Sequence, residues 1–195
     1  MKNTSKSHLL PDLLRPHLKL VFCGTAAGTV SAAAGHYYAH PHNKFWKTLH
    51  SVGLTPRRLD PSEFRKLLDW GIGLTDIAKT VCGMDKELPK GSLGELACRD
   101  LAARIGKFRP GILAFTSLTA GRRFLGSGIT FGEQDQMIAS TRIWVLPSPS
   151  PTAQWNWDEK WWRRLAERVG EGELRQETPS PAKTKDLLAL SKGRS

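Results

Sequence analysis

The stretch LKLVFCGTAAG, residues 18–28, decides the class of fold. Leu18 to Cys23 form a short, mostly apolar run that stops at Gly24, a pattern typical of a buried strand running into a turn. The turn from Gly24 to Gly28 contains only small side chains, so its backbone is open to close approach by another group. The stretch therefore predicts a buried strand followed by a tight turn, as in α/β proteins.

Strands and helices are predicted to alternate along the rest of the chain. Apolar runs predict strands at 111–116 and 141–146, and the glycine-flanked segment 71–76 is either a loop or a short strand. Helical spacing and capping signals, among them the boxes Ser92/Glu95 and Asn156/Glu159, predict helices over 43–49, 61–70, 92–107, 120–125 and 156–169. This alternation predicts a three-layer α/β/α sandwich with a central, mostly parallel sheet.

The length of 195 residues fits one folded domain with loose ends. We expect the domain to cover residues 18–170. Residues 1–17 are polar and broken by two prolines, which predicts an N-terminal tail with at most a short helical turn. Residues 171–195 are rich in Gly, Pro, Ser, Lys and Glu, which predicts a disordered, basic C-terminal tail.

The chain is strongly basic, with 29 Lys and Arg against 18 Asp and Glu and a net charge of +11. Such an excess indicates binding to a polyanion, contact with an anionic membrane surface, or a solvated basic shell. The three cysteines form no CxxC pair, which argues against a disulfide framework or a four-cysteine cluster and favours a reducing cytoplasm. No apolar run reaches the roughly 18 residues that a membrane span needs, so we expect no membrane partner.

In a parallel sheet the ligand site lies at the carboxyl ends of the strands, which here places loops 24–43, 73–80 and 147–156 together. These loops carry a resemblance to a known family. Their motifs are VFCG at 21–24 with Gly28, AHP at 39–41 with Asn43 and FWK at 45–47, GIGLTD at 71–76, and WVLPSPS at 144–150. In this order they resemble the motifs of mismatch-specific uracil-DNA and thymine-DNA glycosylases, over roughly residues 18–169. The resemblance implies a uracil-DNA glycosylase-like fold, an activity on damaged bases in DNA, and no cofactor.

The chain departs from this family inside the first motif. Mismatch-specific members have an asparagine that positions the attacking water where this chain has Ala26, and a proline where it has Ala27. Water must then be activated by another group, or the reaction must depend on stabilising the leaving base through backbone N–H groups of the turn. Asp76 is the first candidate for the missing group and Asn43 the second. Each has an alternative, since Asp76 could cap a helical turn or contact the base edge, and Asn43 could cap the helix beside it.

Base and DNA contacts are also implied by the resemblance. Gly24, Thr25 and Ala26 would hold the flipped base through their backbone, and Tyr38 would stack on it. The loop with Ser148, Ser150, Pro151, Thr152 and Gln154 would bind DNA in the minor groove, with Gln154 or Trp155 filling the gap that the base leaves. His36, His40 and His42 lie close together, but without Cys or acidic ligands they do not predict a metal site.

We therefore expect a monomeric, monofunctional glycosylase that uses water to remove uracil and other deaminated or damaged bases from DNA. A second hypothesis, motivated by Ala26, is a non-catalytic protein that binds damaged or abasic DNA. A third is an α/β enzyme acting on nucleotides or phosphorylated small molecules, which predicts weak dependence of binding on salt. DNA binding, in contrast, weakens steeply as salt rises, because phosphate contacts release counterions.

Overall fold

The structure, a computed structural model, describes residues 8–177 of the chain, and a five-stranded sheet lies at its centre. The strand order is β2-β1-β3-β5-β4; the first four strands in this order are parallel, and β4 runs antiparallel to β5. The strands are β1 (Leu20–Gly24), β2 (Ile72–Asp76), β3 (Ile112–Phe115), β4 (Gly132–Ile138) and β5 (Thr141–Val145). The segment 71–76, left open between loop and strand, is thus a strand.

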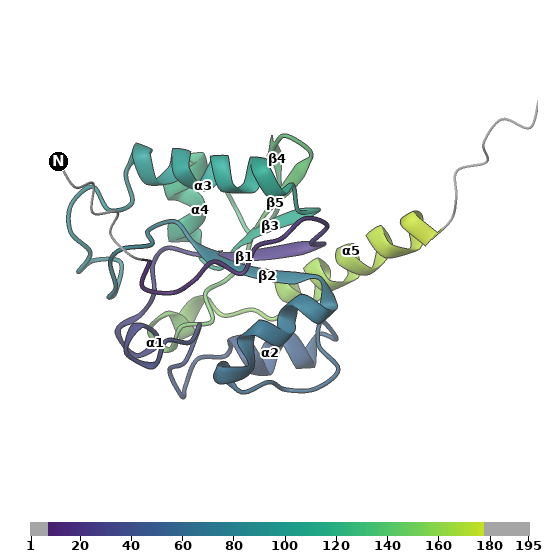
Figure 1. Cartoon of the computed structure of the whole chain (residues 1–195), viewed down its shortest axis with the longest axis horizontal. Coiled ribbons are helices and arrows are strands. Elements are labelled where there is room, and N and C mark those ends of the chain that lie inside the picture. The colour runs from purple at the N-terminus through teal and green to yellow at the C-terminus, as the bar shows by residue number, and fades with distance from the viewer. Residues whose placement is uncertain (1–7, 178–195) are drawn as a thin grey trace, which may run out of the picture.

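Helices cover both faces of the sheet (Figure 1). One layer contains α3 (Glu95–Phe108) and α4 (Leu118–Leu125). The other contains α1 (Thr29–Ala34), α2 (Phe45–Ser51), the 3-10 helix η1 (Pro61–Trp70) and α5 (Lys160–Glu177). A second 3-10 helix, η2 (Pro151–Asn156), lies between β5 and α5. The predicted three-layer α/β/α sandwich with a mostly parallel sheet is confirmed.

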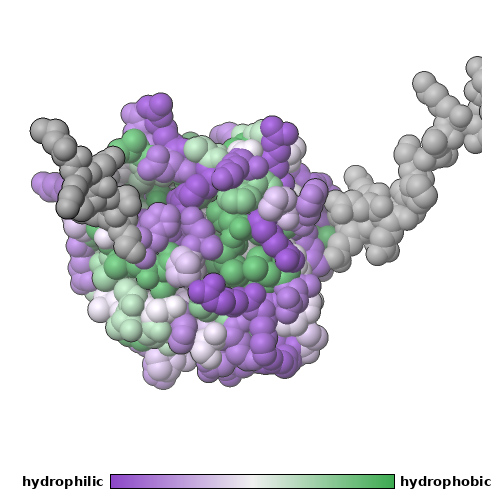
Figure 2. All heavy atoms as spheres, in the orientation of Figure 1, coloured by the Kyte–Doolittle hydropathy of each residue, from purple (hydrophilic) through white to green (hydrophobic). Residues whose placement is uncertain are grey.

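Strand β1 joins the two cores of the molecule. Leu20 and Phe22 point into the core beneath α2 and α5, where Phe22 stacks on Trp162 at a centroid distance of 5.5 Å. Val21 and Cys23 point into the opposite core, formed with α3 and α4. Apolar residues gather between the helical layers on the face seen in Figure 2, with hydrophilic residues around them. A strand buried on both faces has a nearly continuous run of apolar residues, which is why residues 20–23 identified it.

Three elements were not predicted, and one of them, η2, lies within the segment 147–156 that was expected to be a loop. Strand β4 has the sequence GEQDQMI and lies at the sheet edge with most of its side chains at least partly exposed, so it has no alternation of apolar residues to reveal it. Its pairing with β5 supplies the backbone hydrogen bonds that make it a strand. Helix α1 is six residues long, too short to show a helical period.

Two predicted helix starts are wrong. Helix α3 begins at Glu95 with Gly94 as N-cap and no side-chain cap, and Ser92 lies in the turn before it, where its N–H donates to the carbonyl of Pro89 (3.1 Å). Helix α5 begins at Lys160, four residues after Asn156, because residues 151–156 form η2. The carboxylate of Asp158 accepts a hydrogen bond from the N–H of Lys160 (3.0 Å).

The folded unit begins earlier than the expected boundary at residue 18. Leu10 and Leu13 are 1% and 4% exposed, and Leu13 exchanges backbone hydrogen bonds with Leu74 (2.9 and 3.2 Å). Gly73 allows this contact, since a Cβ there would collide with the carbonyl oxygen of Leu13. At the other end, α5 continues past residue 170 to Glu177, and the remainder of the predicted tail lies outside the described residues. Within residues 8–177, none of the helices combines the length and the apolar character that crossing a membrane requires.

Candidate active site

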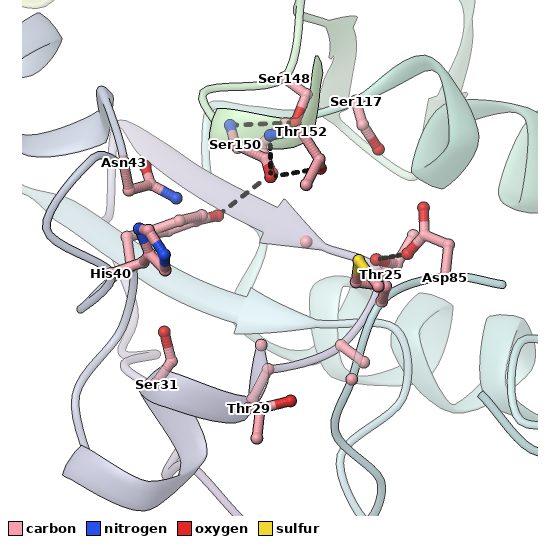
Figure 3. Close-up of a pocket in the computed structure, with 18 of the residues that line it drawn as sticks. Thr25, Thr29, Ser31, His40, Asn43, Asp85, Ser117, Ser148, Ser150 and Thr152 are labelled. Atoms are coloured by element: carbon pink, nitrogen blue, oxygen red, sulfur yellow. Dashed lines mark hydrogen bonds between the residues drawn. The ribbon is translucent and has the colours of Figure 1, made fainter. Parts of the chain in front are cut away.

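A pocket of about 730 Å³ opens at the carboxyl ends of the parallel strands. Gly24 ends β1, Asp76 ends β2, Thr116 follows β3 and Ser148 follows β5, and all four line the pocket. The volume suits a small organic group the size of a nucleobase with its sugar. The three loops expected at this edge do meet here (Figure 3).

The turn from Gly24 to Gly28 forms one wall of the pocket, and its backbone is held by the segment that follows β2. The carbonyls of Gly24 and Thr25 accept hydrogen bonds from the N–H groups of Ile77 (3.0 Å) and Ala78 (2.8 Å). Gly24 is required for space, because a Cβ there would lie 2.6 Å from Oδ1 of Asp76. The small residues of the turn therefore let the carboxyl group of Asp76 lie directly against the backbone.

Asp76 places a buried carboxyl group at the bottom of the pocket. The residue is 4% exposed, and among the described residues no group donates a hydrogen bond to its carboxyl oxygens. Burial raises the pKa of Asp76 from 3.8 to about 6; the positive charges of Lys79 and Arg104 oppose this rise, and the negative charge of Asp12 adds to it. A carboxyl group without partners, aimed into a cavity, is available to a ligand.

A network of buried and partly buried charged groups lies next to Asp76. Asp12 forms ion pairs with Lys79 (2.9 Å) and Arg104 (2.9 Å), and it accepts a hydrogen bond from the hydroxyl of Thr75 (2.7 Å). Arg104 also donates to the backbone carbonyl of Asp76 (3.0 Å). The cations lower the pKa of Asp12 against the opposing effect of its burial. Asp12 lies in the segment predicted to be a tail, so sequence analysis missed it.

Tyr38 forms an aromatic wall. Its ring stacks on Phe45 at a centroid distance of 3.9 Å and an interplanar angle of 16°, and its hydroxyl shares a hydrogen bond with that of Thr116 (3.1 Å). Its φ of +52° lies in the left-handed region, which is uncommon for a side chain of this size. Burial raises the pKa of the Tyr38 hydroxyl, so it stays protonated. Phe45 thus supports one face of the ring, as a stacking platform requires.

Asn43 and His40 line the side of the pocket next to helix α2. The side-chain oxygen of Asn43 accepts a hydrogen bond from the N–H of Phe45 (3.0 Å), the first residue of α2, whereas Lys44 holds the N-cap position without a side-chain cap. Nδ1 of His40 accepts from the N–H of His42 (3.2 Å), which fixes the loop. Within residues 8–177, no three His, Cys, Asp or Glu side chains lie close enough to hold a metal ion.

The loop after β5 borders the opening. Ser148, Ser150, Pro151 and Thr152 line the pocket, and the hydroxyls of Ser150 and Thr152 share a hydrogen bond of 2.9 Å. The loop is anchored at both sides, since the carbonyl of Pro149 accepts from the N–H of Lys44 (2.9 Å) and that of Pro147 from the indole of Trp162 (3.1 Å). The side chain of Gln154 lies outside the described residues. Trp155 is 83% exposed.

Sequence analysis missed one wall of the site entirely. Residues 83–87, between β2 and α3, line the pocket, and the carboxylate of Asp85 accepts a hydrogen bond from the hydroxyl of Thr25 (2.5 Å). Thr116 and Ser117 at the end of β3 were also missed. The position of Thr116 and Ser117 after a predicted strand could have identified them, whereas segment 83–87 has no such signal.

The fold and this pocket define an α/β protein with its ligand site at the carboxyl ends of the sheet strands. The sequence profile of the Uracil DNA glycosylase superfamily matches residues 11–168, and the chain belongs to this superfamily. Its fold is similar to the solution structure of a Methanosarcina acetivorans protein named "putative Uracil DNA glycosylase". The two share 18% sequence identity and a TM-score of 0.60, over 85% of this chain and 98% of that chain.

Proposed function

We propose that this protein is a monofunctional DNA glycosylase that removes uracil and other deaminated bases from DNA by hydrolysis. Membership of the superfamily supports activity as a glycosylase, and the motif resemblance of residues 18–169 supports the mismatch-specific branch. The net charge of +11 supports attraction to the DNA backbone. The observation that carries the proposal is the buried, unpartnered carboxyl group of Asp76 at the bottom of a base-sized pocket.

The depth of Asp76 favours a contact with the base. A base in a duplex must be flipped out to reach a pocket, and it enters with the edge opposite its sugar foremost. Asp76 is 4% exposed, so it meets this leading edge, whereas the sugar stays near the opening. We therefore assign to Asp76 the contact with the base edge, the alternative noted from the sequence, in place of the activation of water.

A carboxylate at the base edge would favour deaminated bases over normal ones. An ionised carboxylate only accepts hydrogen bonds. Deamination replaces the ring-nitrogen lone pair of cytosine or adenine with the N–H of uracil or hypoxanthine, which such an acceptor can bind. A carboxylate facing cytosine would instead meet a lone pair, and leaving polar groups unpaired gives strong discrimination. Because the pKa of Asp76 is about 6, preference for uracil should strengthen as the pH rises through this value.

Other walls of the pocket complete the binding of a base. The free face of the Tyr38 ring can stack on the base, since Phe45 covers the other face. The backbone of Thr25 and Ala26 lines the same cavity and can donate N–H groups to the oxygen of the departing base without reorganising. Asn43 keeps its amide N–H group available, because only its side-chain oxygen is bound, to the N–H of Phe45.

The test is incubation of purified protein with end-labelled duplexes containing one uracil, one hypoxanthine or only normal bases, followed by alkali. Strand scission at uracil and hypoxanthine alone is the expected result. Sodium borohydride should trap no adduct with DNA, since the proposed nucleophile is water and not a lysine such as Lys86 at the pocket. Tight retention of the uracil duplex with no scission would overturn the proposal and favour the non-catalytic binder.

A further inference from the structure

Besides the buried Asp76, the pocket is lined by two carboxylates on the loop formed by residues 83–87, those of Asp85 and Glu87. Oε2 of Glu87 accepts a hydrogen bond from the N–H of Met84 within this loop (3.3 Å). Oδ1 of Asp85 accepts a hydrogen bond from the hydroxyl of Thr25 (2.5 Å), so this carboxylate is attached to the turn that forms the pocket wall (Figure 3). Asp85 is exposed, in contrast to the buried Asp76. The two carboxyl groups therefore serve the same cavity at different depths.

The backbone near Asp85 is also tied to the turn. Ala27 and Cys82 form a parallel β-bridge, and the carbonyl of Ala27 accepts a hydrogen bond from the N–H of Gly83 (3.0 Å). Residues 84–87 then form a tight turn in which the N–H of Glu87 donates to the carbonyl of Met84 (2.8 Å). Asp85 thus occupies a fixed place beside the turn and does not sit on an unanchored loop.

One oxygen of this carboxylate is free for a ligand. Oδ1 is bound to Thr25, and among the described residues Oδ2 has no hydrogen-bond donor. The neighbouring side chain of Ala26 offers no polar atom, so Asp85 supplies the acceptor on this part of the rim. A flipped nucleotide with its base against Asp76 has its sugar at the opening, where Asp85 lies.

We propose that Asp85 is the catalytic residue that holds and deprotonates the attacking water. This inference rests on the proposed function. The water oxygen forms a bond to C1′ of the sugar as the C1′–N bond breaks, and the electron pair of that bond leaves with the base. The proton of the water passes to Asp85, and the departing base anion takes a proton from solvent. The negative charge of Asp85 also stabilises the positive charge that develops on the sugar.

The negative charge of Asp85 should affect DNA binding and cleavage in different ways. An exposed carboxylate where DNA must approach repels phosphate, so removing it should leave DNA binding unchanged or tighter. Removing a general base should slow the chemical step by about 10²–10⁴-fold. We therefore expect that a variant without the Asp85 carboxylate cleaves DNA more slowly while its affinity for DNA is unchanged or higher.

The experiment compares Asp85→Ala with Asp135→Ala, which removes the same charge from an exposed position on β4 outside the pocket. Single-turnover cleavage of a uracil duplex and binding to an uncleavable duplex are measured for both. We expect Asp85→Ala to cleave at least 10²-fold more slowly with unweakened binding, and Asp135→Ala to cleave like the wild type. Thr25→Val, which leaves the carboxylate unanchored, should cleave about tenfold more slowly.

Several results would overturn the assignment. Wild-type rates in Asp85→Ala would exclude a role in the chemical step, and equal losses in both alanine variants would reduce the effect to net charge. A loss of DNA binding that accounts for the slower cleavage would make Asp85 a structural residue. In all three cases the wild type still cleaves uracil DNA. A wild type that cleaves no duplex would instead overturn the proposed function itself.

Discussion

Replacing the buried carboxyl group of Asp76 with an amide should stabilise the protein, and the gain should depend on pH. Burial raises the pKa of Asp76 from 3.8 to about 6. At about 1.4 kcal/mol per unit, ionising this group costs the folded protein roughly 3 kcal/mol. Between these pH values the folded state binds more protons than the unfolded chain, so wild-type stability falls as the pH rises through this range.

The amide of Asp76→Asn does not ionise, so the stability of this variant does not fall in this way as the pH rises. The difference in unfolding free energy between the variant and the wild type should therefore increase by roughly 3 kcal/mol as the pH rises, most of it between pH 4 and pH 7. Any effect of the amide itself is the same at every pH and does not change this increase. At pH 7 this contribution corresponds to a melting temperature higher by about 6–12 °C. The same variant should lose its preference for uracil over cytosine, because the carboxylate that lowers the stability of the fold is the group that selects the base.

Urea unfolding of wild type and Asp76→Asn, followed by tryptophan fluorescence in steps from pH 4 to pH 8, measures this difference directly. Titrations common to both proteins largely cancel in the subtraction. Asp135→Asn, which removes an exposed carboxylate from β4, controls for the change in net charge. A difference in stability that stays constant over this pH range would refute the reasoning, because it would mean that burial does not shift the ionisation of Asp76.

Three further substitutions test other parts of the site. Gly24→Ala places a Cβ 2.6 Å from Oδ1 of Asp76, so the carboxyl group must move and uracil cleavage should fall about 10²-fold; an unchanged rate would show that the close contact is not needed. Lys79→Met removes the more deeply buried of the two cations that pair with Asp12 and should lower stability by about 3 kcal/mol in urea unfolding. It should also raise the pKa of Asp76 further and shift the onset of uracil preference to higher pH; an unshifted pH profile would contradict the charge network. Trp155→Ala, at a side chain 83% exposed, should leave stability within about 0.5 kcal/mol and slow cleavage of duplex DNA about tenfold, with single-stranded DNA unaffected. Equal losses on both substrates would argue against a role in filling the gap left by the base.

The parts of the site that were found from the sequence lie at the ends of strands. Gly24, Asp76 and Ser148 each end or follow a strand that is wholly or mostly buried, and parallel pairing brings such positions to one edge. Tyr38 was identified by resemblance alone. The role that we propose for Asp76 rests on its burial in the structure, because its depth favours a contact with the base over a contact with the sugar.

Other parts of the site depend on contacts between residues far apart in the chain. Asp12 is partly buried and forms ion pairs with Lys79 and Arg104, which lie 67 and 92 positions further along the chain. Nothing in the local sequence around Asp12 predicts those pairs, because a polar, proline-broken segment looks like a tail until its partners are known. Asp85 likewise has no local signal, and only its hydrogen bond to Thr25 places it at the pocket.

The sequence by itself determined the alternating α/β architecture, the central strand at residues 18–24, the edge of the sheet where the site lies, and the basic charge suited to DNA. A buried strand can be identified from the apolar residues of that strand alone, and the net charge is the sum of the charges of all residues. Neither depends on which residues meet in space. Only the tertiary structure decided that residues 8–17 belong to the fold, that Asp76 is buried without a partner, and that Asp85 borders the opening. Ionisation and access to a ligand depend on what surrounds a group in space, and the surrounding residues come from distant parts of the chain.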